Sequence, residues 1–156
     1  MRALFAPLTL ILLLSTLTLS DTAFAVNRQT TYGDVTVSEV TSIYDGDTFR
    51  VNIKDWPRVV GYHMPVRVSG IDAPEMKGKC PKEIALARKA KQAVVAMLRD
   101  GKKIELRNLR RDKYFRLLAD VYVDGKSLSE TLLQAGLAYA YEGGKKKSWC
   151  GATEPK

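Results

Sequence analysis

The chain is poor in the residue types that several kinds of active site require. Its 156 residues include one histidine and two cysteines. A single histidine, His63, excludes catalysis by a histidine pair, and its Tyr-His-Met-Pro surroundings are typical of a loop without a chemical role. Two distant cysteines and one histidine do not form a zinc-binding pattern. Proton transfer and metal binding are therefore left to the carboxylates.

Long hydrophobic runs are confined to the start of the chain. Met1-Arg2 is followed by an almost uncharged, leucine-rich stretch, and Ala23-Phe24-Ala25 has the small-x-small form of a signal peptidase site. The run is short for a bilayer span, and no basic cluster follows it. We expect residues 1–25 to be a cleaved signal peptide and the protein to be secreted or periplasmic, without membrane attachment. An uncleaved anchor is the alternative, and the mature N-terminus would distinguish the two.

The expected export predicts how the two cysteines, Cys80 and Cys150, are used. In an oxidising compartment an isolated pair tends to form a disulfide. A Cys80–Cys150 bridge would close a long loop and stabilise the fold by roughly 3–4 kcal/mol in the chain-entropy model. It would also tie down residues 143–156, which look like a loose basic tail.

The composition is that of one basic globular domain. Hydrophobic residues make up 46% of the chain and charged residues 27%, and the formal net charge is +8. Such a balance favours a folded domain with a polyanionic partner: nucleic acid, an anionic membrane or an acidic polysaccharide. A charge that only keeps the protein dispersed is the alternative.

Hydrophobic periodicity predicts five strands and two helices. Period-two alternation indicates strands, with an expected bulge in the first, at 35–43, 49–53, 64–68, 104–106 and 117–123. Spacings of three and four indicate helices at 82–99 and 128–135. We expect loops at 54–62 and 107–113. The predicted class is α+β, mainly β: a five-stranded oligonucleotide-binding (OB) fold barrel with two or so packed helices, over residues 26–142.

Three carboxylates and two arginines stand out as candidates for phosphodiester chemistry. Asp47 and Asp72 each follow or precede a turn at a strand end, where carboxylate and backbone oxygens could bind calcium. Glu75 could activate a metal-associated water. Arg67 and Arg116 could hold a phosphate. On residue type alone, the aspartates could equally be turn formers and the arginines could pair with neighbouring carboxylates.

The order of these segments narrows the choice. Four motifs follow one another: Asp45-Gly46-Asp47-Thr48, then Arg67 with Ile71-Asp72-Ala73-Pro74-Glu75, then Arg111-Asp112-Lys113-Tyr114-Phe115-Arg116, then Asp124-Gly125-Lys126 with the helix that ends Gln134-Ala135-Gly136. In this order, over about residues 35–141, the chain resembles the staphylococcal nuclease (thermonuclease) family.

The resemblance implies the family's OB barrel, a single calcium ion, and cleavage of DNA and RNA with little sequence preference to leave 3′-phosphate ends. By motif position, the calcium ligands would be the carboxylates of Asp47 and Asp72 and the carbonyl of Ala73. The same comparison makes Glu75 the general base and Arg67 and Arg116 the catalytic arginines.

Motif position also suggests residues that contact the nucleic acid. Lys113 and Tyr114 match a lysine and a tyrosine near the nucleotide phosphate, and Tyr139 or Tyr141 matches a further tyrosine. We expect a monomer with DNA and/or RNA as substrate and no stable protein partner. A non-catalytic OB-fold protein of the cell envelope that binds nucleic acid is the alternative function.

The chain departs from the family at several positions. Alanine stands at position 73 in place of threonine, and Phe115 replaces the usual glycine before the arginine. The loop after Glu75 is short, and the basic tail replaces the C-terminal helix of the family. We expect the disulfide to hold the chain end in place of that helix.

Overall fold

A computed structural model describes residues 30–151. The predicted signal peptide and the last five residues of the predicted tail lie outside these described residues. The elements follow in the order β1 (Val35–Thr36), β2 (Glu39–Ile43), β3 (Thr48–Asn52), α1 (Arg58–Gly61), β4 (Met64–Val68), β5 (Ile71–Asp72), α2 (Pro81–Asp100), β6 (Ile104–Arg111), β7 (Leu117–Val123), β8 (Lys126–Ser127), α3 (Leu128–Gln134) and β9 (Tyr139–Ala140).

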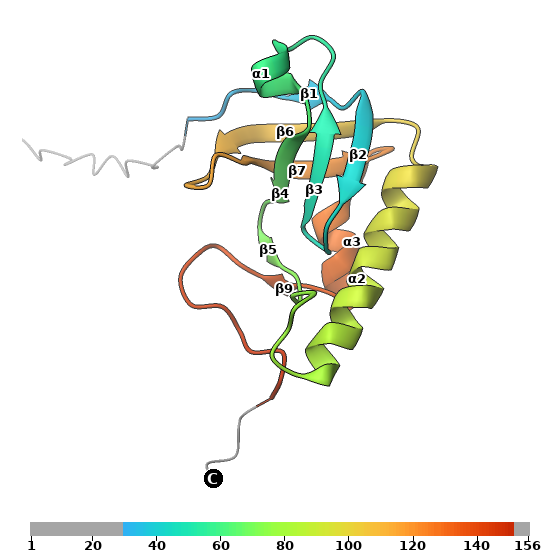
Figure 1. Cartoon of the computed structure of the whole chain (residues 1–156), viewed down its shortest axis with the longest axis vertical. Helices are drawn as coiled ribbons and strands as arrows, with labels where there is room; N and C mark the ends of the chain where they lie inside the picture. The colour runs from blue at the N-terminus through green and yellow to red at the C-terminus, as the bar shows by residue number, and fades with distance from the viewer. Residues whose placement is uncertain (1–29, 152–156) are drawn as a thin grey trace, which may run out of the picture.

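The main sheet has the strand order β1-β6-β7-β4-β3-β2, with β8 paired to β7. Its two end strands, β1 and β2, are consecutive in the chain. Between them, Val37 N–H donates to the Ile104 carbonyl at 2.9 Å, and Ser38 N–H donates to the Asn52 carbonyl at 3.0 Å. One segment thus pairs with β6 through its first part and with β3 through its second, so the sheet curls into a half-barrel (Figure 1).

The predicted class, mainly β with few helices, is confirmed. The strand expected at 35–43 divides into β1 and β2, and the expected bulge is a register shift between Val40 and Ser42. Two local predictions were wrong in part. The loop expected at 54–62 contains the helical turn α1, which begins after Pro57, a residue with a helix-compatible φ of −52°.

The second error concerns the connector expected at 107–113. Strand β6 continues to Arg111, because β7 pairs with it from Ile104↔Val123 to Arg111↔Leu117 across a bulge between Arg107 and Arg110. The second half of this strand was not recognised from the sequence, because its residues are mainly basic and show little hydrophobic alternation. The long β6–β7 hairpin delivers the Asp112–Arg116 turn to the end of the sheet.

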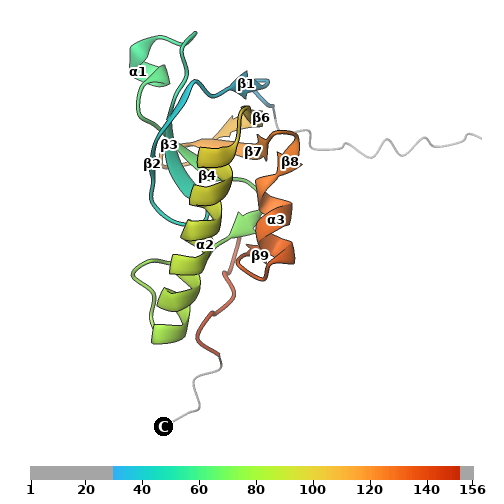
Figure 2. The ribbon, with the colours of Figure 1, turned by 90° about the vertical axis from the view of Figure 1, so that its right-hand side faces the viewer.

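Helices α2 and α3 pack on the sheet through their apolar sides (Figure 2). In α2 the buried residues are Glu83, Ala87, Ala90, Val94 and Leu98. In α3, Leu128 and Leu132 are buried, and the Ser127 hydroxyl accepts the Glu130 N–H at 3.2 Å, which confirms the predicted helix start. Among the described residues, no helix is long and apolar enough to cross a membrane.

The core lies inside the curl of the sheet and under α2 and α3. Alternate residues of β3, β4 and β7 fill it, with the fully buried Phe49, Val51, Val66 and Val121 at its centre. The opposite alternation leaves Arg67 on the other face of β4, which is the face that the site uses.

Candidate active site

Strand pairing brings the first two motifs together. The antiparallel β3–β4 register places Thr48 opposite Arg67, and the Asp47 carbonyl accepts the Val68 N–H at 2.8 Å. The Asp45 carboxylate shapes the turn before β3, because its Oδ1 accepts the N–H groups of Asp47 at 3.0 Å and Thr48 at 2.7 Å. The turn therefore directs the Asp47 side chain toward Arg67.

The guanidinium of Arg67 is held between two carboxylates. Its Nη1 lies 2.7 Å from Asp47 Oδ2, and its Nη2 lies 3.7 Å from Asp72 Oδ1. The same Nη2 donates to the Ile71 carbonyl at 2.9 Å. All three side chains are largely buried, at 11%, 8% and 4% exposed for Arg67, Asp47 and Asp72. Such burial makes the cluster rigid.

Burial disfavours the charged form of the Asp47 carboxylate more than the neighbouring Arg67 favours it. Burial raises its pKa to about 7, although Arg67 beside it acts in the opposite direction and Asp45 adds to the rise. Its Oδ2 also accepts the Ala73 N–H at 2.7 Å, and its Oδ1 accepts the Thr48 hydroxyl at 3.0 Å. A further cation near Asp47 would stabilise the charged form.

Asp72 presents a buried oxygen to the same place. Its Oδ1 atom is fully buried and accepts no hydrogen bond of good geometry within the described residues. Two cations approach it, Lys146 Nζ at 2.7 Å and Arg67 Nη2 at 3.7 Å. Lys146 also lies 3.1 Å from Glu75 Oε1. The side chain of Glu75 is 53% exposed, so it faces solvent beside the buried Asp72.

The third motif forms a turn stabilised by Asp112. Its Oδ1 accepts the N–H groups of Tyr114 and Arg116, both at 2.9 Å, and its Oδ2 accepts Arg116 Nε at 2.7 Å. Burial opposes the charged form of Asp112, but the hydrogen bonds from Arg116 and Tyr114 outweigh it and lower the pKa. Phe115 takes a φ of +63°, a backbone conformation that glycine adopts without strain and that other residues rarely adopt.

One cleft joins the three motifs. Its volume is about 760 Å³, and its walls include Asp47, Arg67, Glu75, Lys113, Tyr114, Arg116, Tyr141 and Lys146. Parallel pairing of β4 with β7 puts Arg67 opposite Leu118, so Arg116, two residues earlier, shares that face. Asp72 and Ala73 are buried beside the cleft rather than lining it.

Comparison with known proteins identifies the family of the chain. A model of the family described as "Staphylococcal nuclease homologue" matches residues 65–153. The chain belongs to the staphylococcal nuclease family. The match begins after Asp47, so the place of Asp47 at the site rests on its contact with Arg67.

Relatives of this nuclease family include bacterial and fungal proteins. The chain is 41% identical over 103 residues to the SPbeta prophage-derived endonuclease YokF of Bacillus subtilis (strain 168). This match covers 63% of this chain and 33% of that protein. The chain is 40% identical over 103 residues to the endonuclease YncB of the same organism, over 63% of this chain and 46% of that protein.

A fungal relative matches over a longer stretch. The probable endonuclease LCL3 of Colletotrichum graminicola (strain M1.001 / M2 / FGSC 10212) is 36% identical over 138 residues, or 76% of this chain and 50% of that protein. The chain spans a third to a half of the length of these relatives.

The residues present fit the calcium ion that is typical of the nuclease family. Calcium prefers carboxylate and carbonyl oxygens. Here the buried Asp72 Oδ1 has no hydrogen-bond partner among the described residues and is approached by the cations Lys146 and Arg67, and the pKa of the neighbouring Asp47 is raised by burial. A divalent cation bound here would therefore stabilise the charged forms of both carboxylates.

Some of the other residues singled out from the sequence line the cleft, and others do not. Lys113 and Tyr114 lie on the cleft wall, and Tyr114 is 67% exposed. Of the two candidate tyrosines, Tyr141 lines the cleft, whereas Tyr139 stacks on Trp149 with ring centroids 3.8 Å apart. His63 lies outside the cleft, next to Thr41.

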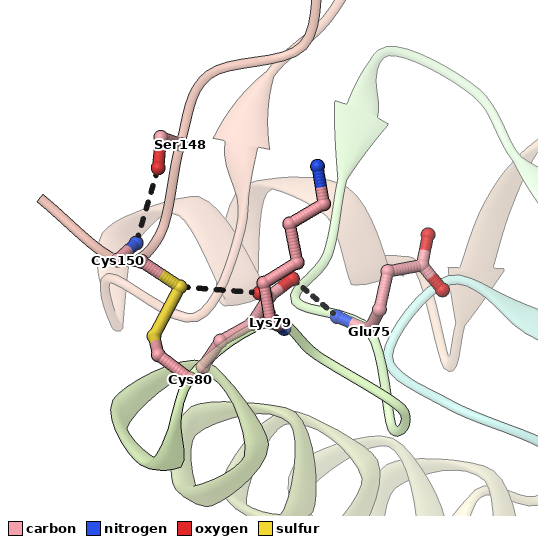
Figure 3. The surroundings of a disulfide bond; sticks show 6 residues. Glu75, Lys79, Cys80, Ser148 and Cys150 are labelled. Atoms are coloured by element: carbon pink, nitrogen blue, oxygen red, sulfur yellow. Dashed lines mark hydrogen bonds between the residues drawn. A yellow bond between two sulfur atoms is a disulfide. The ribbon is translucent and has the colours of Figure 1, made fainter. Parts of the chain in front are cut away.

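The Cys80–Cys150 disulfide is formed in the structure. It joins the start of α2 to the end of the described chain, beside the loop between Glu75 and Lys79 (Figure 3). Trp149 is buried against Tyr139, so the disulfide and this ring stack together hold the described part of the C-terminal tail, residues 143–151.

Sequence reasoning missed Glu83. This buried carboxylate accepts the Lys79 N–H at 2.8 Å and the Glu75 N–H at 3.4 Å, and so organises the loop that begins with Glu75. A signal was present, because Glu83 stands on the same helical side as Ala87 and Ala90, at spacings of four and three. A charge on the buried side of a helix needs a polar partner.

Proposed function

We propose that this protein is a calcium-dependent nuclease that hydrolyses phosphodiester bonds of DNA and/or RNA with little sequence specificity. The observation that carries the proposal is the meeting of Arg67, Glu75 and Arg116 at one cleft, next to the acidic pair Asp47 and Asp72. The endonuclease names of the relatives support it. Under this proposal the curled sheet is the OB barrel of the family.

The acidic side of the cleft would hold one calcium ion. Asp47 and Asp72 would supply carboxylate oxygens, and Ala73, whose N–H already donates to Asp47, would supply its carbonyl. When bound, the ion would act as a Lewis acid that lowers the pKa of an associated water and neutralises phosphate charge.

Glu75 is the general base in this mechanism. Its half-exposed carboxylate is open to water and lies beside the buried Asp72. It would take a proton as a water oxygen bonds to phosphorus. The bond from phosphorus to the 5′ oxygen breaks, that oxygen takes up a proton from solvent, Glu75 returns its own proton to solvent, and the products end in a 3′-phosphate and a 5′-hydroxyl.

Arg67 and Arg116 would bind the phosphate from two sides. Arg67 is fixed by Asp47 and the Ile71 carbonyl, and Arg116 is fixed through its Nε by Asp112. Because both guanidinium groups are oriented in advance, little reorganisation is needed as negative charge develops on the phosphate oxygens.

The turn that carries Arg116 would also contact the nucleic acid. The exposed Tyr114 ring offers a stacking surface, and Lys113 lies 5.1 Å above that ring. Stacking on the face of a base and contacts to phosphate carry little sequence information, so little sequence preference is expected. With a net charge of +8, binding should weaken strongly with salt.

We further propose that the protein acts as a secreted or periplasmic monomer. The predicted N-terminal signal peptide and the disulfide support export, since disulfides persist in oxidising compartments. Fractionation and the N-terminal residue of the mature protein test this part independently of activity.

Digestion of plasmid DNA and of RNA by the purified protein tests the activity. We expect cleavage with calcium, none with a chelator, and losses of about 100-fold or more in Glu75→Gln and Arg116→Ala. Arg50→Ala is the matched control, since Arg50 is exposed and bonds the His63 carbonyl outside the cleft. Binding without cleavage in calcium would favour the non-catalytic alternative, and unchanged cleavage in chelator would exclude the calcium mechanism.

A further inference from the structure

Residues 141–150 form a strap across one side of the cleft. This C-terminal strap leaves β9 and returns beside the first turn of α2 (Figure 1). At its start, Tyr141 N–H donates to the Gly70 carbonyl at 2.9 Å, next to the β5–β9 pair. At its end, Cys150 is bonded to Cys80. Both ends of the strap are therefore anchored.

The anchors act on the same elements that carry the acidic residues. In the β5–β9 pair, Tyr139 stands opposite Asp72 and also stacks on Trp149. The disulfide joins the strap to the residue that precedes α2, at the end of the loop that begins with Glu75 (Figure 3). The middle of the strap is thereby kept close to Asp72 and Glu75.

Lys146 occupies that middle position. Its Nζ lies 2.7 Å from Asp72 Oδ1 and 3.1 Å from Glu75 Oε1, so one ammonium group bridges both carboxylates. The contact to Asp72 is an ion pair with a buried oxygen that accepts no hydrogen bond of good geometry from any described residue. The Lys146 side chain is itself 48% exposed, but its neighbours differ from it in their contacts: Lys145 is exposed and forms no ion pair within residues 30–151, and Lys147 lies over the Tyr139 ring at 5.4 Å.

An ammonium group and a calcium ion cannot use the same carboxylate oxygen. Calcium binds oxygen at about 2.3–2.6 Å, and a positive charge at hydrogen-bond distance from that oxygen would repel it. Tethering at both ends keeps the local concentration of the Lys146 ammonium high, as in any intramolecular competitor.

We propose that Lys146 is a residue of the metal site that competes with the divalent cation for Asp72 and Glu75 and is displaced when the cation binds. This inference rests on the proposed function, because it requires a cation at Asp72. It assigns the strap a role in setting metal affinity, beyond its role in holding the chain end. Displaced Lys146 would leave both carboxylates to the metal and the water.

Calcium titration of the full chain by calorimetry, without nucleic acid, tests the competition. We expect Lys146→Ala to bind calcium about fivefold more tightly or better than the unmodified protein, as the lost ion pairs and typical coupling energies suggest. Lys146→Arg should keep the competition. Lys145→Ala is the matched control and should leave calcium affinity unchanged.

Amine labelling followed by mass spectrometry gives a second readout. Calcium should speed acetylation of Lys146 and leave that of Lys145 unchanged. Equal calcium affinity in Lys146→Ala and Lys145→Ala, or a Lys146 labelling rate insensitive to calcium, would overturn the competition while leaving the nuclease proposal intact. Absence of calcium binding in every variant would overturn both, and weaker calcium binding in Lys146→Ala would show that Lys146 assists the site.

Discussion

Arg67 and Asp47 form a buried ion pair, with Nη1 and Oδ2 2.7 Å apart. The pair lies at the end of the β3–β4 ladder, where Thr48 stands opposite Arg67. The pair links the turn between β2 and β3, which contains Asp47, to strand β4, which precedes Asp72. A residue proposed to hold phosphate and one proposed to hold metal thus depend on each other for their orientation.

Arg67→Ala should therefore affect stability as well as catalysis. Removing one partner of a buried pair leaves the other desolvated, which costs about 3 kcal/mol in unfolding free energy. Calcium should restore part of that loss, because a divalent cation replaces the missing charge near Asp47. Urea unfolding with calcium and with chelator measures both effects, with Arg50→Ala as the control. Unchanged stability of Arg67→Ala would contradict the dependence of Asp47 on Arg67.

Glu83 is a positioning residue for Glu75. Its carboxylate accepts the N–H groups of Glu75 and Lys79, and an amide oxygen in Glu83→Gln can serve only one of them well. We expect kcat to fall about tenfold with KM nearly unchanged, since substrate contacts stay in place. Steady-state kinetics and thermal unfolding separate this from a loss of fold.

The matched control for Glu83 is Glu130→Gln in the first turn of α3. Glu130 is exposed and far along the chain from the loop that carries Glu75. A proportional loss of kcat and folded fraction in Glu83→Gln would indicate a purely structural role.

Gly46 is a packing contact between the acidic turn and α2. A Cβ atom there would lie 2.8 Å from the Cβ atoms of both Ala73 and Ala90. Gly46→Ala should therefore push the Asp45–Asp47 turn away from its neighbours and cost about 1–3 kcal/mol of stability. Adding Ala90→Gly should recover part of it. Chemical denaturation of the single and double variants measures this; additive losses would show that the two sites do not interact.

Asp124 should contribute stability that depends on pH. Its carboxylate accepts the N–H groups of Lys102 and Lys103, and these hydrogen bonds lower its pKa from the ordinary 3.8. A carboxyl with a lowered folded pKa stabilises the fold above the unfolded pKa, and this contribution disappears as pH falls through the folded pKa.

Comparison with Asp124→Asn reveals this contribution. Asparagine also tolerates the positive φ of 49° at this position, so the backbone should be preserved. The stability difference between the two proteins should be constant near neutral pH, begin to shrink as the pH falls toward the ordinary value of about 4, and vanish once the pH lies below the lowered folded pKa. A difference that persists in acid would assign the effect to packing.

Much of the fold could be predicted from local pattern. Strand alternation, the capping Ser127 and the stop at Gly136 are encoded over a few residues, so β3, β4, β7 and α3 were located closely. β6 and α1 were not, because arginines and a proline-led turn carry weak periodicity. The tiny β5–β9 pair was beyond local pattern altogether, since it depends on residues far apart in the chain.

The sequence by itself determined which residue types could do the chemistry: one histidine left carboxylates and arginines, and the order of four motifs assigned them to a family. Only the tertiary structure decided how they meet. Register across β3, β4 and β7 placed Asp47, Arg67 and Arg116 at one cleft. Packing of α2 placed Glu83 where it accepts the Glu75 N–H. The disulfide-anchored strap placed Lys146 next to Asp72. These relations depend on long-range packing, which no local pattern records.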